Sequence, residues 1–303
     1  MILSPISFSD LNTLKPYFEN QPHELCSYCL EAIIVWIDGD YCPHAGVTDG
    51  SLIVKAQFSV STQRQHLLMP IAPNSAFSPL ALQDLALDQG IEKFWYVPES
   101  YIQHHGHGQV SSFFHIQEQP AFHDYIYRTS DLATLAGNRY AKKRNLINQF
   151  ERNYVDKGRV ELTGLTPSDV EPCLAFLEKW CKAYDCDGED NYDLFCEKQA
   201  IINTLENQKA LVVKGLVLRI DGDVCAFGIG SRLTVDMGVL QFEKAFSDIK
   251  GLYQYFDRQC ARQIFSGFTY LNKESDMGEP GLAKAKKSYH PVRIVKSYQL
   301  TVR

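Results

Sequence analysis

The sequence predicts an α+β fold of two tandem lobes, each a mixed, mainly antiparallel sheet flanked by helices. Three observations lead to this prediction. Strand and helix patterns follow a specific order in residues 159–303, the same order recurs more weakly in residues 1–128, and a helical pattern in residues 129–158 joins the two stretches. The chain has 303 residues, 45% of them hydrophobic, which is enough material for two cores.

The first lobe is expected to contain a strand, two helices, three strands, a helix, a strand, a short helix and a final strand. Ser9 and Asp10 supply an N-cap for the first helix, and Thr48-Asp49-Gly50 supplies a turn between two strands. No residue-level repeat links the lobes, so the duplication depends on element order alone. The expected elements lie at residues 4–8, 9–19, 24–36, 41–46, 52–57, 66–71, 79–89, 94–97, from 99, and 113–127.

The bridge between the lobes has the pattern of a helix interrupted once. Ser130 is a good N-cap, and Gly137-Asn138 is expected to end or kink the helix before an apolar stripe resumes. Lys142, Lys143 and Arg144 form a compact cluster of donors in its middle. They are expected to bind a tRNA backbone, a nucleotide or a lipid head group, or else to form the solvated face of the bridge.

The second lobe gives the clearer pattern. Thr166 to Asp169 supplies an N-cap, and Asp221-Gly222-Asp223 joins two apolar runs as a hairpin turn. The resulting order, β-α-α-β-β-β-α-β-α-β, is the topology of the acyltransferase fold of GNAT-type N-acetyltransferases. The expected elements lie at residues 159–165, 170–181, 192–207, 211–220, 224–233, 237–246, 251–265, 268–271, 280–289 and 292–302.

Charge is distributed unevenly between the two halves. The net charge is −6, but residues 1–138 carry −9 and residues 139–303 carry +3, with the basic residues concentrated in 139–159 and 280–303. Local basic patches on an acidic protein favour a discrete anionic ligand over general binding to nucleic acid. The nine cysteines are an odd number at scattered positions, which indicates reduced thiols.

No stretch approaches the roughly 18 apolar residues of a membrane span, and the N-terminal sequence lacks a signal-peptide pattern. We therefore expect a cytoplasmic protein.

Residues 270–291 are the most informative stretch, because charge and glycine crowd between an apolar run and a predicted strand. Three carboxylates and two glycines precede three lysines on a short helix that begins at Pro280. This arrangement is typical of a site for an anionic group, and the alternative is a solvated helix face behind an acidic loop. The residues are Glu274, Asp276, Glu279, Gly278, Gly281, Lys284, Lys286 and Lys287.

Three blocks of sequence carry a family resemblance: ATLAGNRYAKKRNLINQF, LQFEKAFSDIKGLYQYF and YLNKESDMGEPGLAKAKKSYHPV. In this order and spacing the chain resembles an uncharacterised family related to the C-terminal catalytic domain of phosphatidylglycerol lysyltransferases. That family is similar to tandem GNAT-like proteins and to Fem-type aminoacyltransferases. Two positions depart from its pattern, since Lys273 and Ala283 stand where arginines are expected; lysine loses the planar fork that clamps phosphate, and alanine loses the charge as well.

The resemblance implies an aminoacyl- or acyltransferase that uses aminoacyl-tRNA or acyl-CoA as co-substrate, with no tightly bound cofactor. The acceptor would be an amine or hydroxyl, and a phospholipid head group is one candidate. No segment of this sequence is expected to form the transmembrane flippase portion of the lipid enzymes. The alternative is a noncatalytic binding module that senses a phosphate-bearing ligand such as charged tRNA, coenzyme A or a lipid head group.

The second lobe offers several candidate catalytic residues. Glu243 ends the strand where the two central strands of a GNAT-like sheet diverge, and it is expected to recognise the amine or act as general base. Lys244 would give electrostatic support, or the two would form an internal ion pair. Glu274 and Asp276 are competing candidates for the base, and Asn272 would orient a substrate carbonyl or amine.

Phosphates of the donor are expected at the start of the helix near Lys250 and Gly251, where free N–H groups and the helix dipole favour an anion; the alternative is an ordinary helix start. Gly278 and Gly281 let the later loop turn tightly. By similarity to the lysine that follows the glycine loop of Fem-type enzymes, Lys286 is expected to neutralise a phosphate or an oxyanion.

No metal site is expected. His104, His105 and His107 lie in a glycine loop without a nearby carboxylate or cysteine, a pattern more typical of surface. A zinc site from Cys26, Cys29, Cys42 and His44 is disfavoured because the spacing is loose and the intervening segment is apolar.

Overall fold

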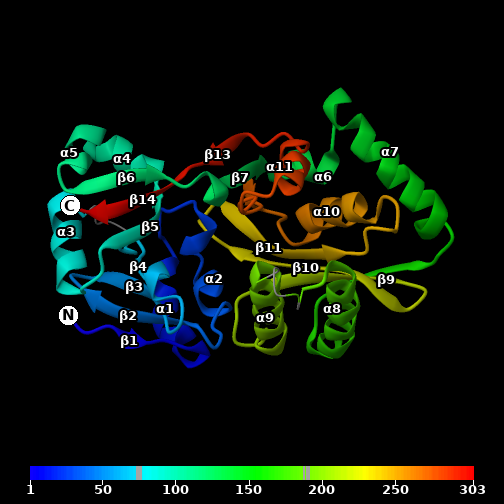
Figure 1. Cartoon of the computed structure of the whole chain (residues 1–303). Coiled ribbons are helices and arrows are strands. Elements are labelled where there is room, and N and C mark those ends of the chain that lie inside the picture. The colour runs from blue at the N-terminus through cyan, green and yellow to red at the C-terminus, as the bar shows by residue number, and fades with distance from the viewer. Residues whose placement is uncertain (73–76, 187, 189–191) are drawn as a thin grey trace.

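The computed structural model describes residues 1–72, 77–186, 188 and 192–303. Two mixed sheets lie side by side, one in each lobe (Figure 1). The first contains, in spatial order, β1 (Ser4–Pro5), β2 (Tyr41–Thr48), β3 (Ser51–Phe58), β4 (His66–Leu67), β5 (Lys93–Pro98), β14 (Ser297–Val302) and β6 (Phe114–Glu118). The second contains β8 (Val160–Gly164), β9 (Lys214–Ile220), β10 (Asp223–Arg232), β11 (Met237–Ala245), β12 (Tyr270–Asn272), β7 (Asp124–Arg128) and β13 (Arg293–Val295).

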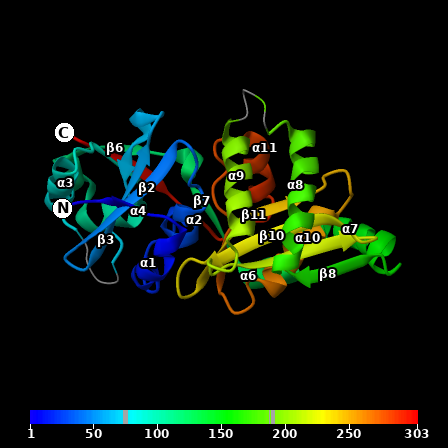
Figure 2. The ribbon, with the colours of Figure 1, turned by 90° about the horizontal axis from the view of Figure 1, so that it is seen from below.

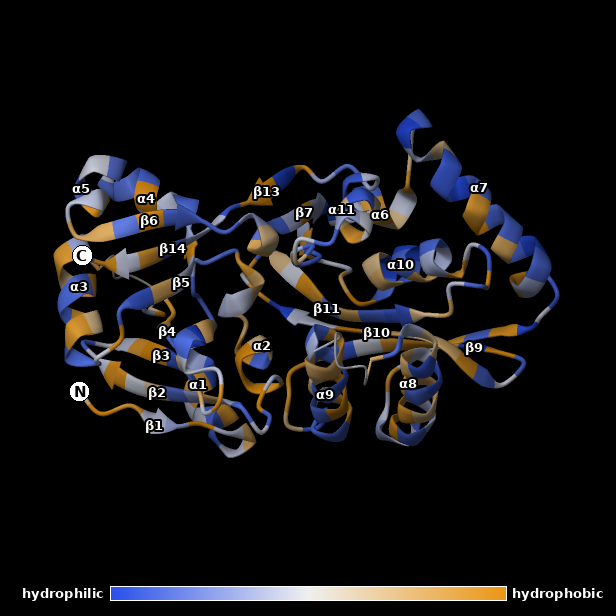
Figure 3. Cartoon of the chain, viewed as in Figure 1, coloured by the Kyte–Doolittle hydropathy of each residue, from blue (hydrophilic) through white to orange (hydrophobic). Residues whose placement is uncertain are grey.

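Helices cover these sheets. In the second lobe α8 and α9 lie next to each other on one face, whereas α10 and α11 lie on the other (Figures 1 and 2). Both α8 and α9 carry apolar and polar residues (Figure 3), and Phe176, Leu177 and Trp180 of α8 are buried in the core. The helices are α1 (Leu11–Phe18), α2 (Leu30–Ile34), α3 (Pro79–Asp88), α4 (Glu99–His105), α5 (His107–Ser111), α6 (Thr129–Thr134), α7 (Ala141–Phe150), α8 (Val170–Tyr184), α9 (Tyr192–Glu206), α10 (Leu252–Gln263) and α11 (Pro280–Lys287).

The two sheets have the same pairing pattern, which confirms the two-lobed GNAT-like fold. In each sheet four antiparallel strands are followed by one parallel pair, β4 with β5 and β11 with β12, and then by two antiparallel strands. The internal duplication inferred from element order is therefore present in the topology.

Each lobe gives its last strand to the other sheet. Strand β7 follows β6 in the chain but lies between β12 and β13 of the second sheet, and β14 follows β13 but lies between β5 and β6 of the first. The single strands expected at 113–127 and 292–302 are therefore wrong, because each is two strands in different sheets. A 3₁₀ turn at Pro120–Phe122 divides the first pair and Lys296 alone divides the second. The domain bounds at 128 and 158 stay a prediction.

Tertiary contacts also change the expected helices. The helix expected at 24–36 is only α2, preceded by a 3₁₀ turn at Cys26–Tyr28, because Cys29 is extended and the Cys26 N–H donates to Asp124 at 2.6 Å. The bridge is interrupted as expected: Leu135 is left-handed, Gly137 has φ +87°, and Arg144 then donates to the carbonyls of both residues.

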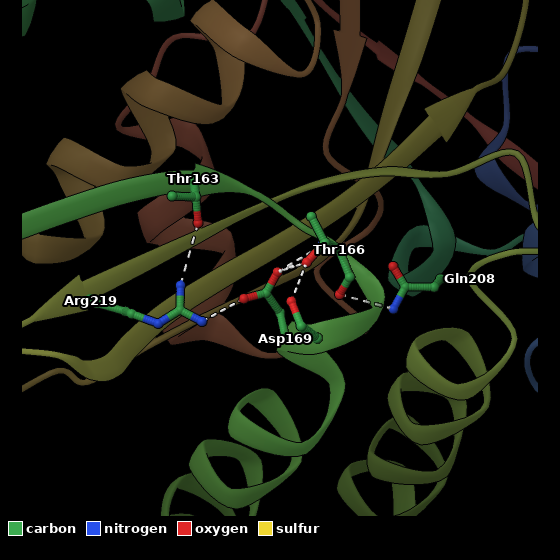
Figure 4. A network of polar contacts seen from close by, with 6 residues as sticks. Thr163, Thr166, Asp169, Gln208 and Arg219 are labelled. Atoms are coloured by element: carbon green, nitrogen blue, oxygen red, sulfur yellow. Dashed lines mark hydrogen bonds and ion pairs between the residues drawn. The ribbon is translucent and has the colours of Figure 1, made fainter.

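A polar network fixes the start of α8 on the second sheet (Figure 4). Thr166 and Asp169 form a capping box, as the sequence predicts, with the Thr166 N–H donating to the Asp169 carboxylate at 2.7 Å. Arg219 of β9 donates to the same carboxylate and to the Thr163 hydroxyl. The network therefore links the helix start to two strands.

Within the described ranges, none of the helices is both long and apolar enough to cross a bilayer.

Gly251 provides a test of how α10 packs on α7. It has φ +85°, and a Cβ there would lie 2.2 Å from the Leu146 carbonyl oxygen. We expect Gly251→Ala to lower the free energy of unfolding by at least about 3 kcal/mol, because the overlap adds to the roughly 1–2 kcal/mol that a left-handed L-residue costs. Urea unfolding measures it.

Gly222→Ala is the matched control, since Gly222 has φ +93° but, its two chain neighbours aside, no atom of a described residue lies within 4 Å of the place that a Cβ would take. This variant should lower the free energy of unfolding only by the cost of a left-handed L-residue, about 1–2 kcal/mol. Equal losses in the two variants would show that the contact with Leu146 does not constrain α10.

Candidate functional site

Strands β11 and β12 diverge where the candidate site begins. They pair in parallel only from Met237 to Val239 and from Tyr270 to Asn272, whereas β11 continues to Ala245. A β-bulge leaves Gln241 without a partner on β10. Bulges re-aim nearby side chains and are common beside active sites. Glu243 thus lies beyond the paired region, as the sequence predicts.

Three charged side chains from different elements meet in this gap. The Lys273 ammonium lies 2.6 Å from Asp257 Oδ1 of α10 and 3.2 Å from Glu243 Oε2 of β11. Their side chains are only 13%, 3% and 14% exposed, respectively. Burial alone would lower the pKa of Lys273, but the two carboxylates raise it well above its usual value. The lysine that replaces an expected arginine therefore serves as a buried counterion.

Glu243 has the chemistry of a proton acceptor. Burial raises its pKa to about 7, although the Lys273 ammonium opposes the shift. Its Oε1 is buried and has no hydrogen-bond partner among the described residues. A carboxylate with one unpaired oxygen and a pKa near neutrality is suited to take a proton from an amine or hydroxyl.

Glu243 and Lys244 do not pair with each other. Lys244 donates to Glu197 of α9 at 2.7 Å and lies 4.2 Å from the centre of the Trp180 ring. The alternative interpretation, an internal ion pair between these two residues, is therefore wrong, because neighbouring residues in a strand point to opposite faces. The electrostatic support expected from Lys244 stays a prediction.

Lys286 holds the loop that follows β12. Its ammonium donates to the carbonyls of Lys273 at 2.6 Å and Ser275 at 2.5 Å, which leaves one of its three N–H donors without a partner among the described residues. Burial lowers the pKa of Lys286 and raises that of Glu274 to about 8, and each group opposes the shift of the other. Glu274 adopts φ +57°, a conformation that costs a non-glycine residue free energy and is enriched at functional sites.

Asn272 connects the lobes. Its fully buried amide donates to Asp124 Oδ2 at 2.7 Å and to the Glu24 carbonyl at 2.9 Å, and its oxygen accepts from the Glu274 N–H at 2.6 Å. The amide is thus engaged at both ends within the protein. Its predicted contact with substrate remains untested, whereas its contact with the loop is direct.

Asp276 lies at the edge of the site. One carboxylate oxygen accepts from the Tyr125 hydroxyl at 2.5 Å, and the other accepts from the Gly278 N–H at 2.9 Å. Gly278 has φ +80°, which the turn requires, and Gly281 is exposed on α11. Asp276 and Lys286 are both half-buried beside Tyr125, so they belong to one local structure.

The expected phosphate contacts at α10 and in the bridge are only partly near this site. Gly251 packs against α7, and Lys250 is exposed. Lys143 points inward, with its ammonium 3.8 Å from the centre of the Tyr289 ring, and burial lowers its pKa. Lys142 is exposed and Arg144 caps α6, so the three bridge cations do not form one patch.

Sequence reasoning missed Asp257, Asp124, Tyr125 and Tyr289. Asp257 follows the inward-facing Phe256 in α10, and a carboxylate at the edge of an apolar helix face was the available signal. Asp124 and Tyr125 gave none, because they reach the site only through the exchange of β7. We call Asp124, Glu243, Asp257, Lys273, Glu274 and Lys286 the charge cluster.

The residues of the disfavoured zinc site make contacts with other protein groups. Cys26 binds Asp124, the Cys29 thiol donates to Glu31 at 3.0 Å, and His44 contacts the Cys42 carbonyl. Over the described ranges, no three His, Cys, Asp or Glu side chains are grouped as metal ligands would be.

Replacing the central cation tests how the charge cluster is compensated. We expect Lys273→Met to lower the free energy of unfolding at pH 7.5 by about 3–5 kcal/mol, since it leaves buried carboxylates without a counterion. Urea unfolding should show a smaller loss for Lys273→Arg, which keeps the charge. Adding Glu243→Gln to Lys273→Met should recover part of the loss; no recovery would mean that Glu243 is not a partner.

The raised pKa of Glu243 predicts a pH-dependent stability. Its pKa is about 7 when folded against an ordinary 4.5, so its contribution is complete below pH 4.5 and is lost as pH rises through 7. The stability of the wild type relative to Glu243→Gln should therefore fall by on the order of 1–3 kcal/mol between pH 5 and pH 8. Unfolding curves at both pH values measure this, and Glu279→Gln controls for loss of an exposed carboxylate. A constant difference would contradict the raised pKa.

Known proteins resemble this chain along most of its length. A conserved protein of unknown function from Bacteroides thetaiotaomicron is 29% identical, and the match covers 100% of both chains with a TM-score of 0.89. The C-terminal domain of a putative lysylphosphatidylglycerol synthetase from Agrobacterium fabrum is 13% identical, with a TM-score of 0.65 over 97% of this chain and 91% of that one. At that identity the second likeness concerns the fold alone.

Two comparisons concern the sequence. An uncharacterised protein of Mycoplasmoides gallisepticum is 24% identical over 181 residues, which are 59% of this chain and 56% of that protein, little more than half its length. The model of the family "Phosphatidylglycerol lysyltransferase, C-terminal" matches residues 51–301, which include β7, β11, the loop after β12 and α11. The chain therefore belongs to the family of phosphatidylglycerol lysyltransferase C-terminal domains.

Proposed function

We propose that this protein is an acyltransferase or aminoacyltransferase whose active site is the charge cluster. Glu243 carries the proposal, because it combines burial, an unpaired oxygen and a pKa of about 7 in the gap between β11 and β12. Family membership and the two-lobed fold agree with transfer of an acyl group. The proposed donor is an aminoacyl-tRNA or an acyl-CoA, and the acceptor is an amine or hydroxyl.

The proposed step forms one bond and breaks one. The acceptor nitrogen or oxygen attacks the acyl carbonyl carbon while Glu243 takes the acceptor proton. The bond from that carbon to the donor oxygen or sulfur then breaks, and Glu243 returns the proton to the leaving group. The free N–H of Lys286 is available to the developing oxyanion, and a preorganised donor stabilises such a charge without reorganisation.

Lys273 helps to keep the pKa of Glu243 in the range in which this carboxylate can act as a base. Without a cation a carboxyl buried to this degree would remain protonated, and without burial it would be too weak a base. The neighbouring ammonium and Asp257 hold it between these limits.

The alternative is a binding module that recognises a phosphate-bearing ligand without turnover. Lys286 belongs to the charge cluster, and the bridge cation Lys143 lies beside it, because the Lys143 and Lys273 ammonium groups contact the same Tyr289 ring. Both cations would serve either function. Thermal unfolding with acyl-CoA, charged tRNA or phosphatidylglycerol vesicles tests binding, since a ligand bound by the folded state alone raises the melting temperature.

A transfer assay with mass spectrometry of the acceptor separates the two functions. We expect the rate at saturating substrate to rise with pH through about 7 in the wild type and to fall about 10²- to 10⁴-fold in Glu243→Gln. Glu274→Gln and Asp276→Asn, assayed alongside, compare the two competing candidates for the base. If the wild type binds a donor but neither it nor any variant forms product, the noncatalytic binding module is supported. Full activity of Glu243→Gln would exclude Glu243 as the base.

A further inference from the structure

A pocket of about 520 Å³ lies between the two lobes, and none of the residues that line it belongs to the charge cluster. Its apolar walls include Leu11 and Phe18 of α1, Leu30 of α2, and Val212 and Leu233 from the second lobe. This size is within the range of pockets that hold small organic molecules.

The rim of the pocket is mainly cationic. Arg232 at the end of β10 donates through Nε to the Thr234 carbonyl at 3.0 Å and across the lobes to the Glu19 carbonyl at 2.8 Å. Three of its five N–H donors remain, and the guanidinium is already held in place. Lys15 of α1 is exposed and forms no ion pair with a described residue, so two cations stand against the single exposed carboxylate of Glu19.

The floor of the pocket is polar, and its polar groups form hydrogen bonds within the protein. The Cys29 thiol donates to Glu31 Oε2 at 3.0 Å and lies 3.0 Å from the Ser231 hydroxyl, and Gln241 donates to the sulfur at 3.9 Å. Burial raises the pKa of Glu31, which favours its uncharged form. The Glu31 carboxyl is buried and engaged by the Cys29 thiol, so Lys15, Glu19 and Arg232 are the charged side chains exposed at the opening of the pocket.

We propose that this pocket binds a single-chain carboxylate of roughly ten carbons, with its apolar body against the α1 and α2 wall and its head group at Arg232 and Lys15. An anionic head group is favoured because the rim has two cations, Arg232 and Lys15, and only one exposed carboxylate, Glu19. The apolar body gains from burial against the leucines and Phe18. The two lobes each supply part of the wall, so the ligand would also tie α1 to β10.

Isothermal titration with decanoate, kept below its micellar concentration, tests the proposal. We expect binding by the wild type, and an affinity about tenfold lower in Arg232→Gln and in Lys15→Gln, the loss expected for a hydrogen bond to a charged group. Arg232→Gln removes a hydrogen bond between the lobes and could lower binding for that reason alone. Lys15→Gln removes an exposed side chain that is in no ion pair with the described residues, so a loss of affinity in this variant reports the contact between a rim cation and the carboxylate. Decanol should bind at least tenfold more weakly, and decylamine more weakly still.

Filling the pocket locates the ligand. Ala210 is exposed on the wall, so Ala210→Trp should abolish decanoate binding, whereas Ala210→Ser should bind as the wild type does, with unchanged circular dichroism in both. Binding retained in Ala210→Trp would overturn the location, and decylamine binding as tightly as decanoate would overturn the head group. Glu243→Gln should bind decanoate normally, which separates this proposal from the proposed function.

Discussion

The reciprocal exchange of β7 and β14 is the constraint on which the rest of the structure depends. A strand within a sheet must pair on both sides, so β7 is fixed by β12 and β13, and β14 by β5 and β6. Separating the lobes would break ladders in both sheets. One apolar core cluster also joins the lobes, since it contains residues of the first lobe together with Phe176, Phe227 and Phe242 of the second. The gap at β11 therefore has walls that cannot move independently.

This constraint explains how so much charge is tolerated inside the protein. Strand β7 brings Asp124 beside Asn272, and Asn272 in turn binds the backbone of Glu274. Lys286 holds the same loop through two carbonyls, which compensates for the strained φ of Glu274. Because the loop is fixed, the Lys273 ammonium stays between its two carboxylates. Burying a charge costs several kcal/mol unless such partners are in place.

Local chemistry was predictable from the sequence, whereas sheet membership was not. Asp221-Gly222-Asp223 turns between β9 and β10, and Thr166 with Asp169 caps the start of α8, because turn and cap residues act on their own neighbours. The helix between β11 and β12 was also predicted, because its apolar residues recur at helical spacing. Which sheet receives β7 depends on contacts with residues far away in the chain, so Asp124 and Tyr125 could not be assigned to the site. Lys273 was identified only as a lost arginine, since its two partners come from other elements.

Strand β11 connects the inter-lobe pocket with the charge cluster. Its bulge residue Gln241 contacts Cys29 at the floor of the inter-lobe pocket, and Glu243 follows two residues later in the charge cluster. The side-chain oxygen of Gln241 and Glu243 Oε1 are both buried without a partner among the described residues. Unpaired buried oxygens destabilise a fold by about 1–3 kcal/mol each, so their persistence on one strand requires a compensating benefit. Strand β11 pairs with β10 on one side and β12 on the other, and this pairing holds the backbone of both residues in place.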